Sequence, residues 1–417
     1  PWPSARQCWR DPGSAANLLP CQRRTAERLV QIAWLGKKSP FCGNVSYGLS
    51  TTEALRERGH QTHFIHFDNP RSPESGSTSL LANDPDVSLP YLVKSQVYTI
   101  PSPGAQRELR DSLERIRPDI VHASLTLSPL DFRLPDLCQQ LGVPLVATFH
   151  PPFDAGMRNL TAGTQQLSYQ LYAPALARYD RVIVFSQLQA EVLIRLGVPA
   201  DRLAVIPNGV DTDRWAPSRH GGDAVLLQRV RQRLGSERTF LYMGRLATEK
   251  NVEALLRAWR LVSPQGCRLV IVGDGPLRGT LQNSFNEPGI LWWGYEADLN
   301  TRIALMQCAE VFLLPSLVEG LSLALLEAMA TGTACIATDA GADGEVLDGG
   351  AGIVLSTQGV ATQLRTLLPV LRDQPVLTAE LGRRARQRAL ERYRLSRNID
   401  AIEQLYGTLL ATRPLAA

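Results

Sequence analysis

Short apolar runs alternate with longer amphipathic stretches along the first half of the chain. The apolar runs have the length of buried strands and lie at residues 32–36, 63–67, 120–122, 145–149, 182–185 and 203–206. The stretches between them predict helices at residues 51–58, 105–116 and 165–178. Strands that alternate with helices in this way indicate a parallel, doubly wound sheet with right-handed crossovers.

The alternation stops at residues 217–223, which are rich in Pro, Gly and His, and then starts again. Further strands are predicted at residues 240–243, 268–272, 290–293, 311–314, 334–337 and 352–355. Further helices are predicted at residues 252–261, 323–330 and 378–410. We therefore expect an α/β fold with two Rossmann-like domains, residues 30–216 and 217–390. Paired domains of this kind bind ligands in the cleft between them, at the carboxyl ends of their strands.

The first 29 residues show neither the period of a strand nor that of a helix. They contain four prolines and no apolar run of the length found in a secretory signal. They also carry five basic and two acidic residues, so most of the formal net charge of +4 belongs to this segment. We expect residues 1–29 to be a disordered leader or a non-native extension; the alternative is a short interaction arm.

Composition excludes several classes of protein. Of the 417 residues, 44% are hydrophobic and 20% are charged, which is typical of a globular protein and not of a disordered or collagen-like chain. No apolar run reaches the roughly 18–20 residues that span a bilayer. The net charge is too small to predict nucleic-acid binding. Seven dispersed cysteines without a C-x-x-C pair favour reduced thiols in a cytoplasmic protein, and no metal site is expected.

Residues 315–330 (PSLVEGLSLALLEAMA) follow a predicted strand and carry two glutamates eight positions apart. Glu319 precedes a helix that we expect to begin at residues 321–322, and Glu327 lies about two turns further along, on a neighbouring face. Gly320 allows backbone N–H groups to approach a ligand, and a helix N-terminus favours phosphate. The segment is therefore either a site for phosphate and sugar hydroxyls or a capped surface helix with a solvated Glu327.

Residues 243–251 (MGRLATEKN) connect a predicted strand to a predicted helix. Gly244 marks a tight turn, and Arg245 and Lys250 stand on either side of the loop. An arginine fork and a lysine point charge can both reach one diphosphate. The alternative is two solvated cations, but only four of the 44 basic residues are lysines, which favours a functional Lys250.

Three weaker signals accompany these motifs. Residues 270–277 (VIVGDGPL) resemble half of a dinucleotide-binding fingerprint, although a strand-to-helix turn needs glycine in any case. Gly43, in residues 37–44 (KKSPFCGN), gives a ligand access to the backbone. His150 ends a strand where it would face the cleft; a single His is more often structural. The chain has no Walker A motif. It also has no G-x-S-x-G motif, and the absence of that motif disfavours an α/β-hydrolase.

Six motifs in this order resemble those of the retaining nucleotide-sugar glycosyltransferases of family 4, which have the GT-B fold. They are FCGN, VATFH, VIPNGVD, GRLATEKN, VGDGPL and EGLSLALLE, and the resemblance covers about residues 31–410. It implies that a C-terminal helix, residues 391–417, crosses back onto the N-terminal domain. Two positions depart from the family pattern: Asn44 follows Gly43 where the family has a second glycine, and Ala334 stands where the family has proline.

The resemblance implies a role for each candidate residue. Arg245 and Lys250 would hold the donor diphosphate beside Gly244 and stabilise the leaving group, and Glu327 would bind the ribose hydroxyls. The groups expected to contact the donor sugar, its phosphates or the base are His150, Glu319, Gly43, Tyr295 and the backbone N–H groups of Gly320, Leu321 and Ser322.

The implied activity is transfer of a hexose from a UDP- or GDP-sugar to a hydroxyl of a lipid or glycan, with retention and without metal or another cofactor. We expect front-face attack with the leaving phosphate as the base, since the sequence supplies no obvious nucleophile. The alternatives are a nucleotide-sugar epimerase or phosphorylase of the same fold, and a scaffold without activity.

A set of basic residues has two interpretations, of which one is peripheral contact with anionic lipids at the inner face of the membrane. The alternative, which we favour, is a solvated helix face in a cytoplasmic protein. The basic residues of this set are Lys37, Lys38, Arg383, Arg384, Arg386, Arg388, Arg392, Arg394 and Arg397.

Overall fold

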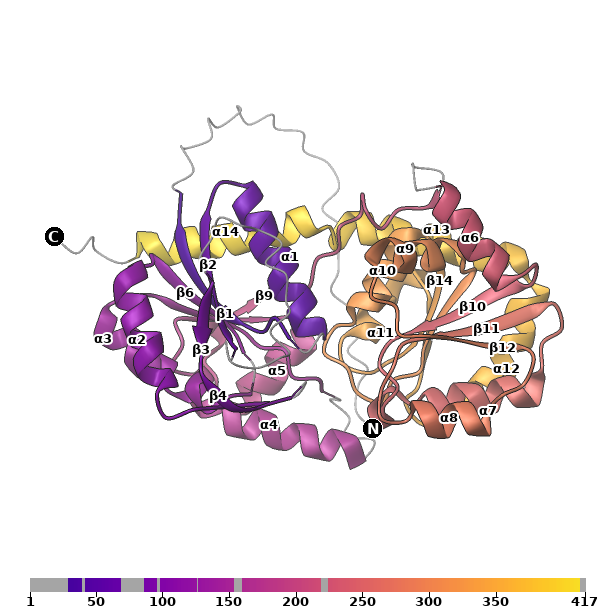
Figure 1. Cartoon of the computed structure of the whole chain (residues 1–417), viewed down its shortest axis with the longest axis horizontal. Helices are drawn as coiled ribbons and strands as arrows, with labels where there is room; N and C mark the ends of the chain where they lie inside the picture. Colours follow the sequence, from indigo (N-terminus) through magenta and orange to yellow (C-terminus); the bar gives the residue numbers. More distant parts are fainter. Residues whose placement is uncertain are drawn as a thin grey trace, which may run out of the picture.

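The computed structural model describes residues 29–39, 42–68, 86–95, 98–125, 127–153, 160–218 and 224–412, with residues 160–165 described by their backbone alone. It contains two parallel sheets, one in each half of the chain, with helices on both faces of each (Figure 1). The predicted α/β fold with two Rossmann-like domains is confirmed. The interpretation of residues 1–29 lies outside the described residues, except for Leu29, and the exact domain boundaries stay predictions.

The sheet of the first half has seven strands in the order β3-β2-β1-β6-β7-β8-β9. Its strands are β1 (Gln31–Gly36), β2 (Gln61–Phe67), β3 (Val87–Leu89), β6 (Ile120–Ser124), β7 (Leu145–Thr148), β8 (Arg181–Val184) and β9 (Leu203–Val205). Its helices are α1 (Gly43–Glu57), α2 (Ala105–Ile116), α3 (Leu134–Leu141), α4 (Leu160–Leu176) and α5 (Gln187–Arg195). Almost every residue of β1, β6 and β7 is buried, because helices cover both faces of the sheet.

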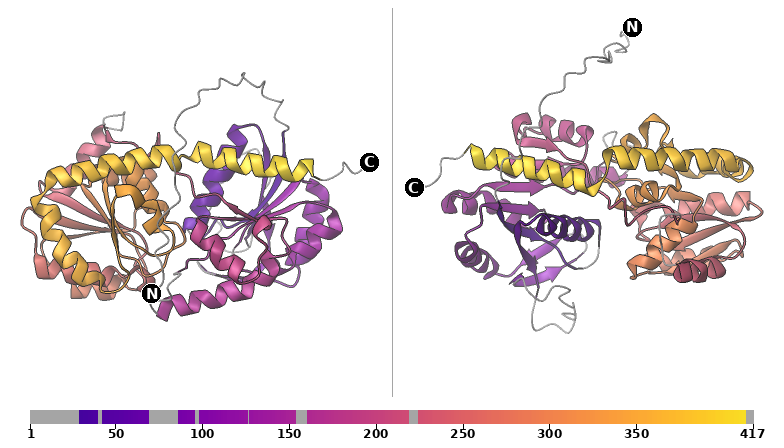
Figure 2. Two further views of the ribbon diagram at one scale, coloured as in Figure 1. Left: turned by 180° about the vertical axis from the view of Figure 1, so that it is seen from behind. Right: turned by 90° about the horizontal axis from the view of Figure 1, so that it is seen from above.

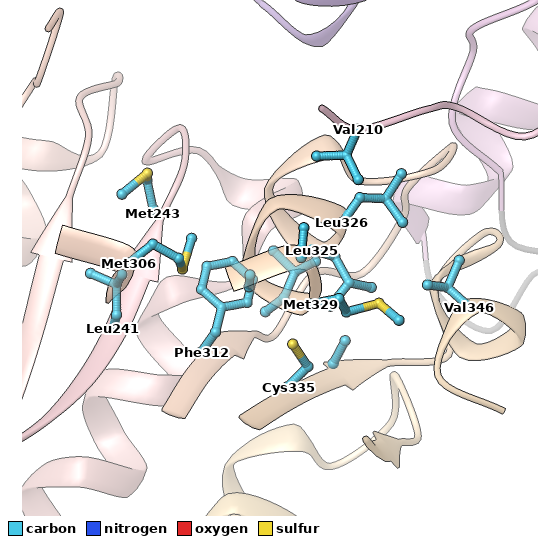
Figure 3. Packing of buried hydrophobic residues seen from close by; sticks show 14 of the residues in the cluster. Val210, Leu241, Met243, Met306, Phe312, Leu325, Leu326, Met329, Cys335 and Val346 are labelled. Carbon is cyan, nitrogen blue, oxygen red and sulfur yellow. The ribbon is translucent and has the colours of Figure 1, made fainter. Parts of the chain in front are cut away.

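The sheet of the second half has six parallel strands in the order β12-β11-β10-β13-β14-β15. Its strands are β10 (Arg238–Met243), β11 (Cys267–Val272), β12 (Ile290–Gly294), β13 (Val311–Leu314), β14 (Ala334–Thr338) and β15 (Ile353–Leu355). Its helices are α6 (Ala224–Leu234), α7 (Val252–Val262), α8 (Arg278–Ser284), α9 (Leu299–Cys308), α10 (Leu323–Thr331), α11 (Asp343–Val346) and α12 (Val360–Asp373). Figure 3 shows part of the apolar core of this half, including Leu241, Phe312 and Met329.

The strand orders locate the point in each sheet where the chain reverses its direction of winding. In the first sheet this point lies between β1 and β6, and in the second it lies between β10 and β13. Loops that leave two neighbouring strands there separate to opposite faces, which opens a ligand-binding position at the carboxyl edge of the sheet. The loops after β1, β6, β10 and β13 are therefore the first places to look for a site.

The end of the chain joins the two halves. Helix α13 (Pro375–Arg392) packs on α10 and β14 of the second half, and α14 (Leu395–Ala411) packs on α1 of the first half. Figure 2 shows both helices in yellow, running across the two halves. The expected return of a C-terminal helix to the N-terminal domain is confirmed.

Some elements differ from the sequence-based expectation. Helix α1 begins at Gly43 and not at residue 51, and the single tail helix expected over residues 378–410 is two helices that meet near Arg394. The short strands β3, β4 (Tyr91–Lys94) and β5 (Thr99–Pro101) were not expected; β4 and β5 form a separate antiparallel hairpin. Helix α10 begins at Leu323, which agrees with the helix predicted over residues 323–330 and is one or two residues after the start expected at residues 321–322, because Ser322 caps it by accepting a hydrogen bond from the Leu325 N–H.

Candidate active site

The two strongest motifs meet at the winding reversal of the second sheet. Lys250 follows β10 and Glu319 follows β13, and β10 and β13 are neighbouring strands. The Lys250 ammonium lies 2.5 Å from Glu319 Oε1, and the Ser316 hydroxyl donates to the same oxygen over 2.7 Å. Glu319 is only 7% exposed, so this ion pair is shielded from water and fixed in position.

Arg245 lies on the same loop as Lys250 and pairs with Glu249, four residues further along that loop. The loop itself is held by its backbone, since the Tyr242 hydroxyl donates to the Arg245 carbonyl over 2.7 Å. Arg245 and Lys250, the two residues predicted to bind the diphosphate, are therefore each paired with a glutamate in the structure. A bound anion would compete with Glu249 and Glu319 for these cations.

The GDG motif supports the Arg245 loop by close backbone packing. A Cβ at Gly273 would lie 1.9 Å from the Gly244 carbonyl oxygen, and a Cβ at Gly275 would lie 2.4 Å from that of Leu246. Both glycines also have positive φ, of 138° and 158°. Only glycine allows this contact, so the motif sets the position of the loop between Gly244 and Leu246.

The loop that carries Glu319 rests on the segment after β14. Gly341 has a φ of 57°, and a Cβ there would lie 2.0 Å from the Glu319 carbonyl oxygen. Asp343, a residue that sequence reasoning missed, accepts the Ser322 N–H over 2.9 Å. The Ser322 N–H, which was expected to contact the donor, is thus already paired. Burial and the nearby Glu319 carboxylate raise the pKa of Asp343 well above its usual range.

Glu327 lies on α10, a little more than one turn after the helix begins at Leu323, because residues 319–322 are not helical and the two helical turns expected after Glu319 do not form. Burial raises the pKa of its carboxyl to about 7, and the positive charge of Arg302 opposes the shift. No described residue forms a hydrogen bond with the carboxylate. A buried carboxyl of this kind gains most from a ligand that donates hydroxyl hydrogens to it.

Tyr295 lies at the rim of the second sheet. It follows β12, two strands away from β10, and is 58% exposed. The backbone before it is tied to the glycine loop, because the Gly273 N–H donates to the Gly294 carbonyl over 2.8 Å. The position at the carboxyl edge agrees with a residue beside a nucleotide base, but Tyr295 does not belong to the group formed around Lys250.

In the first half, His150 follows β7 and Gly43 is the first residue of α1. His150 Nε2 lies 2.8 Å from the Ser124 hydroxyl at the end of β6, and that hydroxyl donates to Asn44 Oδ1 over 3.1 Å. A Cβ at Gly43 would meet no atom within 4 Å, so the N-terminus of α1 is open there. The departure Asn44 is thus in the same hydrogen-bonded group as His150, which the sequence did not reveal.

Backbone contacts bring the two halves together at these loops. The Phe153 N–H donates to the Glu319 carbonyl over 2.8 Å, and a Cβ at Gly320 would lie 3.1 Å from the His150 carbonyl oxygen. Asn208, from the VIPNGVD motif, donates to the Leu321 carbonyl over 3.1 Å. The structure therefore brings the His150 loop of one half against the Glu319 loop of the other.

Comparison with known proteins identifies the family. The protein family described as "Glycosyltransferase Family 4" matches residues 43–214, and the family described as "Glycosyl transferases group 1" matches residues 237–370. A mannosyltransferase of Mycobacterium tuberculosis (strain ATCC 25177 / H37Ra) is 30% identical over 281 residues, which cover 65% of this chain and 70% of that protein. The chain belongs to glycosyltransferase family 4.

Two further proteins are similar to this glycosyltransferase. The Escherichia coli UDP-Gal:alpha-D-GlcNAc-diphosphoundecaprenol alpha-1,3-galactosyltransferase is 26% identical over 316 residues, which cover 72% of this chain and 78% of that protein. The Anabaena protein HepE, solved in complex with UDP-glucose, superposes with a TM-score of 0.69 at 18% identity over 92% of this chain and 100% of its own. The similarity to HepE confirms only that this chain has the GT-B fold.

The basic residues considered for lipid contact are mostly occupied within this glycosyltransferase. Lys37 is 4% exposed, so that part of the expectation is wrong, and Lys38 forms an ion pair with Asp86. Arg386 and Arg388 donate to backbone carbonyls of neighbouring segments. Among the helices of the described ranges, none has the length and apolar character needed to cross a bilayer. In the same ranges, no three His, Cys, Asp or Glu side chains are grouped as metal ligands.

Proposed function

We propose that this glycosyltransferase moves a hexose from a UDP- or GDP-sugar to a hydroxyl of a lipid or glycan acceptor, with retention of the anomeric configuration. The observation that carries the proposal is the pairing of Lys250 with Glu319 at the winding reversal of the second sheet. One residue supplies positive charge for a diphosphate and the other supplies oxygens for sugar hydroxyls. Both residues lie at the carboxyl edge of the sheet, at the position where sheets of this kind bind their ligands.

The two cations of the β10 loop suit a diphosphate leaving group. Arg245 and Lys250 each pair with a glutamate in the structure, and a diphosphate would offer these two cations more negative charge than one carboxylate does. Positive charge fixed beside the departing phosphate stabilises the negative charge that develops there. The chain's own cations thus take the part that a metal ion plays elsewhere, and we propose turnover without metal and without another cofactor.

Retention by front-face attack is the mechanism we favour. A retaining glycosidase forms a covalent intermediate on a free carboxylate. Here Glu319 Oε1 already accepts from Ser316 and pairs with Lys250, which suits a hydrogen-bonding role and disfavours nucleophilic attack. The acceptor hydroxyl would then attack on the face that the diphosphate leaves, with the leaving phosphate oxygen taking its proton. The protein's task is to position and to stabilise charge.

A donor screen tests the proposed reaction. UDP-, GDP- and ADP-sugars are incubated with the enzyme and a lipid and glycan extract; mass spectrometry identifies the product, and NMR gives its anomeric configuration. We expect one donor to be consumed with retention, in the presence of a chelator. Conversion of the donor without acceptor would indicate an epimerase, transfer to inorganic phosphate would indicate a phosphorylase, and inversion would contradict the mechanism.

Lys250→Ala tests the site itself. We expect a loss of roughly 10²–10³ in kcat, because one group that stabilises the leaving charge is removed. Arg257→Ala is the matched control, since Arg257 is an exposed cation on the next helix and pairs only with Glu253 in the described chain. Equal activity of Lys250→Ala and Arg257→Ala, with both variants folded, would rule out the assignment of Lys250.

The enzyme's location follows from the same proposal. We propose a cytoplasmic enzyme in which the exposed arginines of α13, of which Arg383 and Arg384 pair with Glu380, form a solvated helix face. Co-sedimentation with liposomes tests this interpretation. Binding that depends on anionic lipid would contradict it and would indicate peripheral contact at the inner face of the membrane.

A further inference from the structure

We propose that Asn44 acts through Ser124 to fix the tautomer of His150, so that His150 Nδ1 accepts a hydrogen bond from a hydroxyl of the donor sugar. Asn44 is a positioning residue in this scheme, because it acts on the ligand only through His150. The part that concerns the sugar rests on the proposed function, whereas the tautomer does not. The inference follows from the direction of three hydrogen bonds.

The first hydrogen bond fixes the amide of Asn44. Asn44 Nδ2 lies 3.0 Å from the carbonyl oxygen of Leu125. A carbonyl oxygen can only accept, so the NH2 group of the amide must face Leu125. The other end of the amide, Oδ1, is therefore an acceptor and faces Ser124.

The second and third hydrogen bonds carry this direction to His150. The Ser124 hydroxyl lies 3.1 Å from Asn44 Oδ1 and 2.8 Å from His150 Nε2. A hydroxyl has one hydrogen, and Asn44 Oδ1 takes it. Ser124 Oγ must then accept from His150, so the Nε2 of His150 carries a proton.

The imidazole of His150 has no second proton to place on Nδ1. Burial, together with the charge of Lys37, lowers the pKa of His150 to about 3, so the ring is neutral at physiological pH. A neutral imidazole with a proton on Nε2 has a lone pair on Nδ1. The rings of Tyr47 and Phe185 pack edge-on against the imidazole, with centroids 5.0 Å and 5.2 Å away, and hold its orientation.

The lone pair of Nδ1 is the part of His150 that remains for a ligand. No described residue forms a hydrogen bond with Nδ1, and the His150 backbone lies against Gly320 of the candidate donor loop. A sugar hydroxyl can donate to this nitrogen, whereas a carboxylate would place its own lone pairs against it. The geometry therefore favours a neutral hexose over a uronic acid at this position.

The chain-specific part of the inference is Asn44. With glycine at this position, the Ser124 hydroxyl would be free to donate to His150 Nε2, and the proton could move to Nδ1. Asn44 removes that freedom, because its Oδ1 accepts the only hydrogen of the Ser124 hydroxyl. The departure from the family's second glycine at Asn44 thus has a defined chemical consequence.

NMR of histidine 15N resonances measures the tautomer directly in the full chain. The signals of His150 are assigned with His150→Gln, and we expect the pattern of a neutral ring with its proton on Nε2. In Asn44→Gly and in Ser124→Ala we expect a mixture of both tautomers. The matched control is Ser46→Gly on the same helix, which loosens α1 without touching the three hydrogen bonds. A proton on Nδ1 in the native chain, or an unchanged Asn44→Gly spectrum, would overturn the inference.

A kinetic comparison tests the consequence for the ligand. The ratio of kcat/KM for a nucleotide hexose to that for the matching nucleotide uronate should fall roughly tenfold in Asn44→Gly and stay unchanged in Ser46→Gly. A ratio unchanged in Asn44→Gly would contradict the role in specificity. If the chain transferred no sugar at all, the proposed function would fail, yet the NMR result would still decide whether Asn44 fixes the tautomer.

Discussion

The Glu327 carboxyl gives the stability of this enzyme a distinct dependence on pH. Its pKa is raised from 4.5 to about 7 in the folded chain, so the folded state holds a proton that the unfolded state has already lost. Stability from this group is therefore full below pH 4.5 and is lost as the pH rises towards 7. The loss is on the order of 3 kcal/mol. Glu327→Gln should remove this slope and make the chain more stable at pH 8.

Denaturant unfolding of the wild type and of Glu327→Gln, followed from pH 4.5 to 8, measures the difference. The comparison of the two chains is essential, because the pKa values of His150 and His122 are lowered to about 3. These two groups make the folded chain less stable as the pH falls, whereas protonation of Glu327 makes it more stable. The contributions of the two histidines cancel between the two chains. Parallel curves for the two chains would show that the Glu327 carboxyl titrates normally.

At the same scale, the sequence predicted the residues that meet at a winding reversal but not the partners that hold them. Lys250 and Glu319 were each expected in a loop that follows a strand, and the structure brings them together at the ends of the neighbouring strands β10 and β13. Asp343 and Asn44 were missed as partners of this site. Each acts through one hydrogen bond to a residue far away in the sequence, and no periodicity or motif records such a contact.

At the scale of elements, helix α14 is held on the first half by a buried polar contact. The Tyr406 hydroxyl lies 2.5 Å from His122 Nδ1, and both side chains are buried. Tyr406→Phe leaves that ring nitrogen without its partner, which should cost about 1–3 kcal/mol in the free energy of unfolding. Gln404→Ala on the same helix is the control, because Gln404 is exposed.

Chemical denaturation of both variants provides the measurement. The pairs of Arg58 with Asp400 and Glu403 remain in Tyr406→Phe, so α14 should stay docked and the chain should unfold in one transition. A free energy of unfolding equal to that of Gln404→Ala would mean that the buried contact adds nothing to the docking of α14.

The elements that the sequence predicted best are the central strands. Their apolar runs are unbroken because both faces of each sheet are covered, and β13 was predicted without error. Helix α1 was predicted to begin late, since Gly43 and Gly48 lower its intrinsic helix propensity while packing on the sheet stabilises it. The hairpin of β4 and β5 is short and lies outside both sheets, so it gave no signal of sufficient length.

At the scale of the whole molecule, the two halves are connected twice, and the two connections are bonded to each other. The first passes through Val210, and the second joins α13 to α14. The Val210 N–H donates to the Tyr393 carbonyl over 2.8 Å, and the Leu395 N–H donates to the Val210 carbonyl over 2.9 Å. A rotation of one half against the other must therefore bend both connections together, which fixes how the His150 loop meets the Glu319 loop.

Gly209 makes this crossing close enough to bond, and Gly209→Ala tests its importance. An added Cβ would lie 2.6 Å from the Leu395 Cα and 2.9 Å from the Asn398 Cβ, neither of which is the end of a flexible side chain. We expect a loss of about 1–3 kcal/mol in stability from overpacking. A shift of the halves of about 1 Å should also lower kcat/KM by roughly 10².

Gly407→Ala is the matched control for this substitution. It lies in α14 with no atom within 4 Å of the added Cβ, so it should stabilise the helix by about 0.5–1 kcal/mol and leave turnover unchanged. Calorimetry gives the stability of each variant, and steady-state kinetics gives its activity. Because Gly209 contacts neither Lys250 nor Glu319 directly, lost activity in a folded Gly209→Ala chain would arise from the arrangement of the halves. Full activity in that chain would mean that the bonded crossing does not set the geometry of the site.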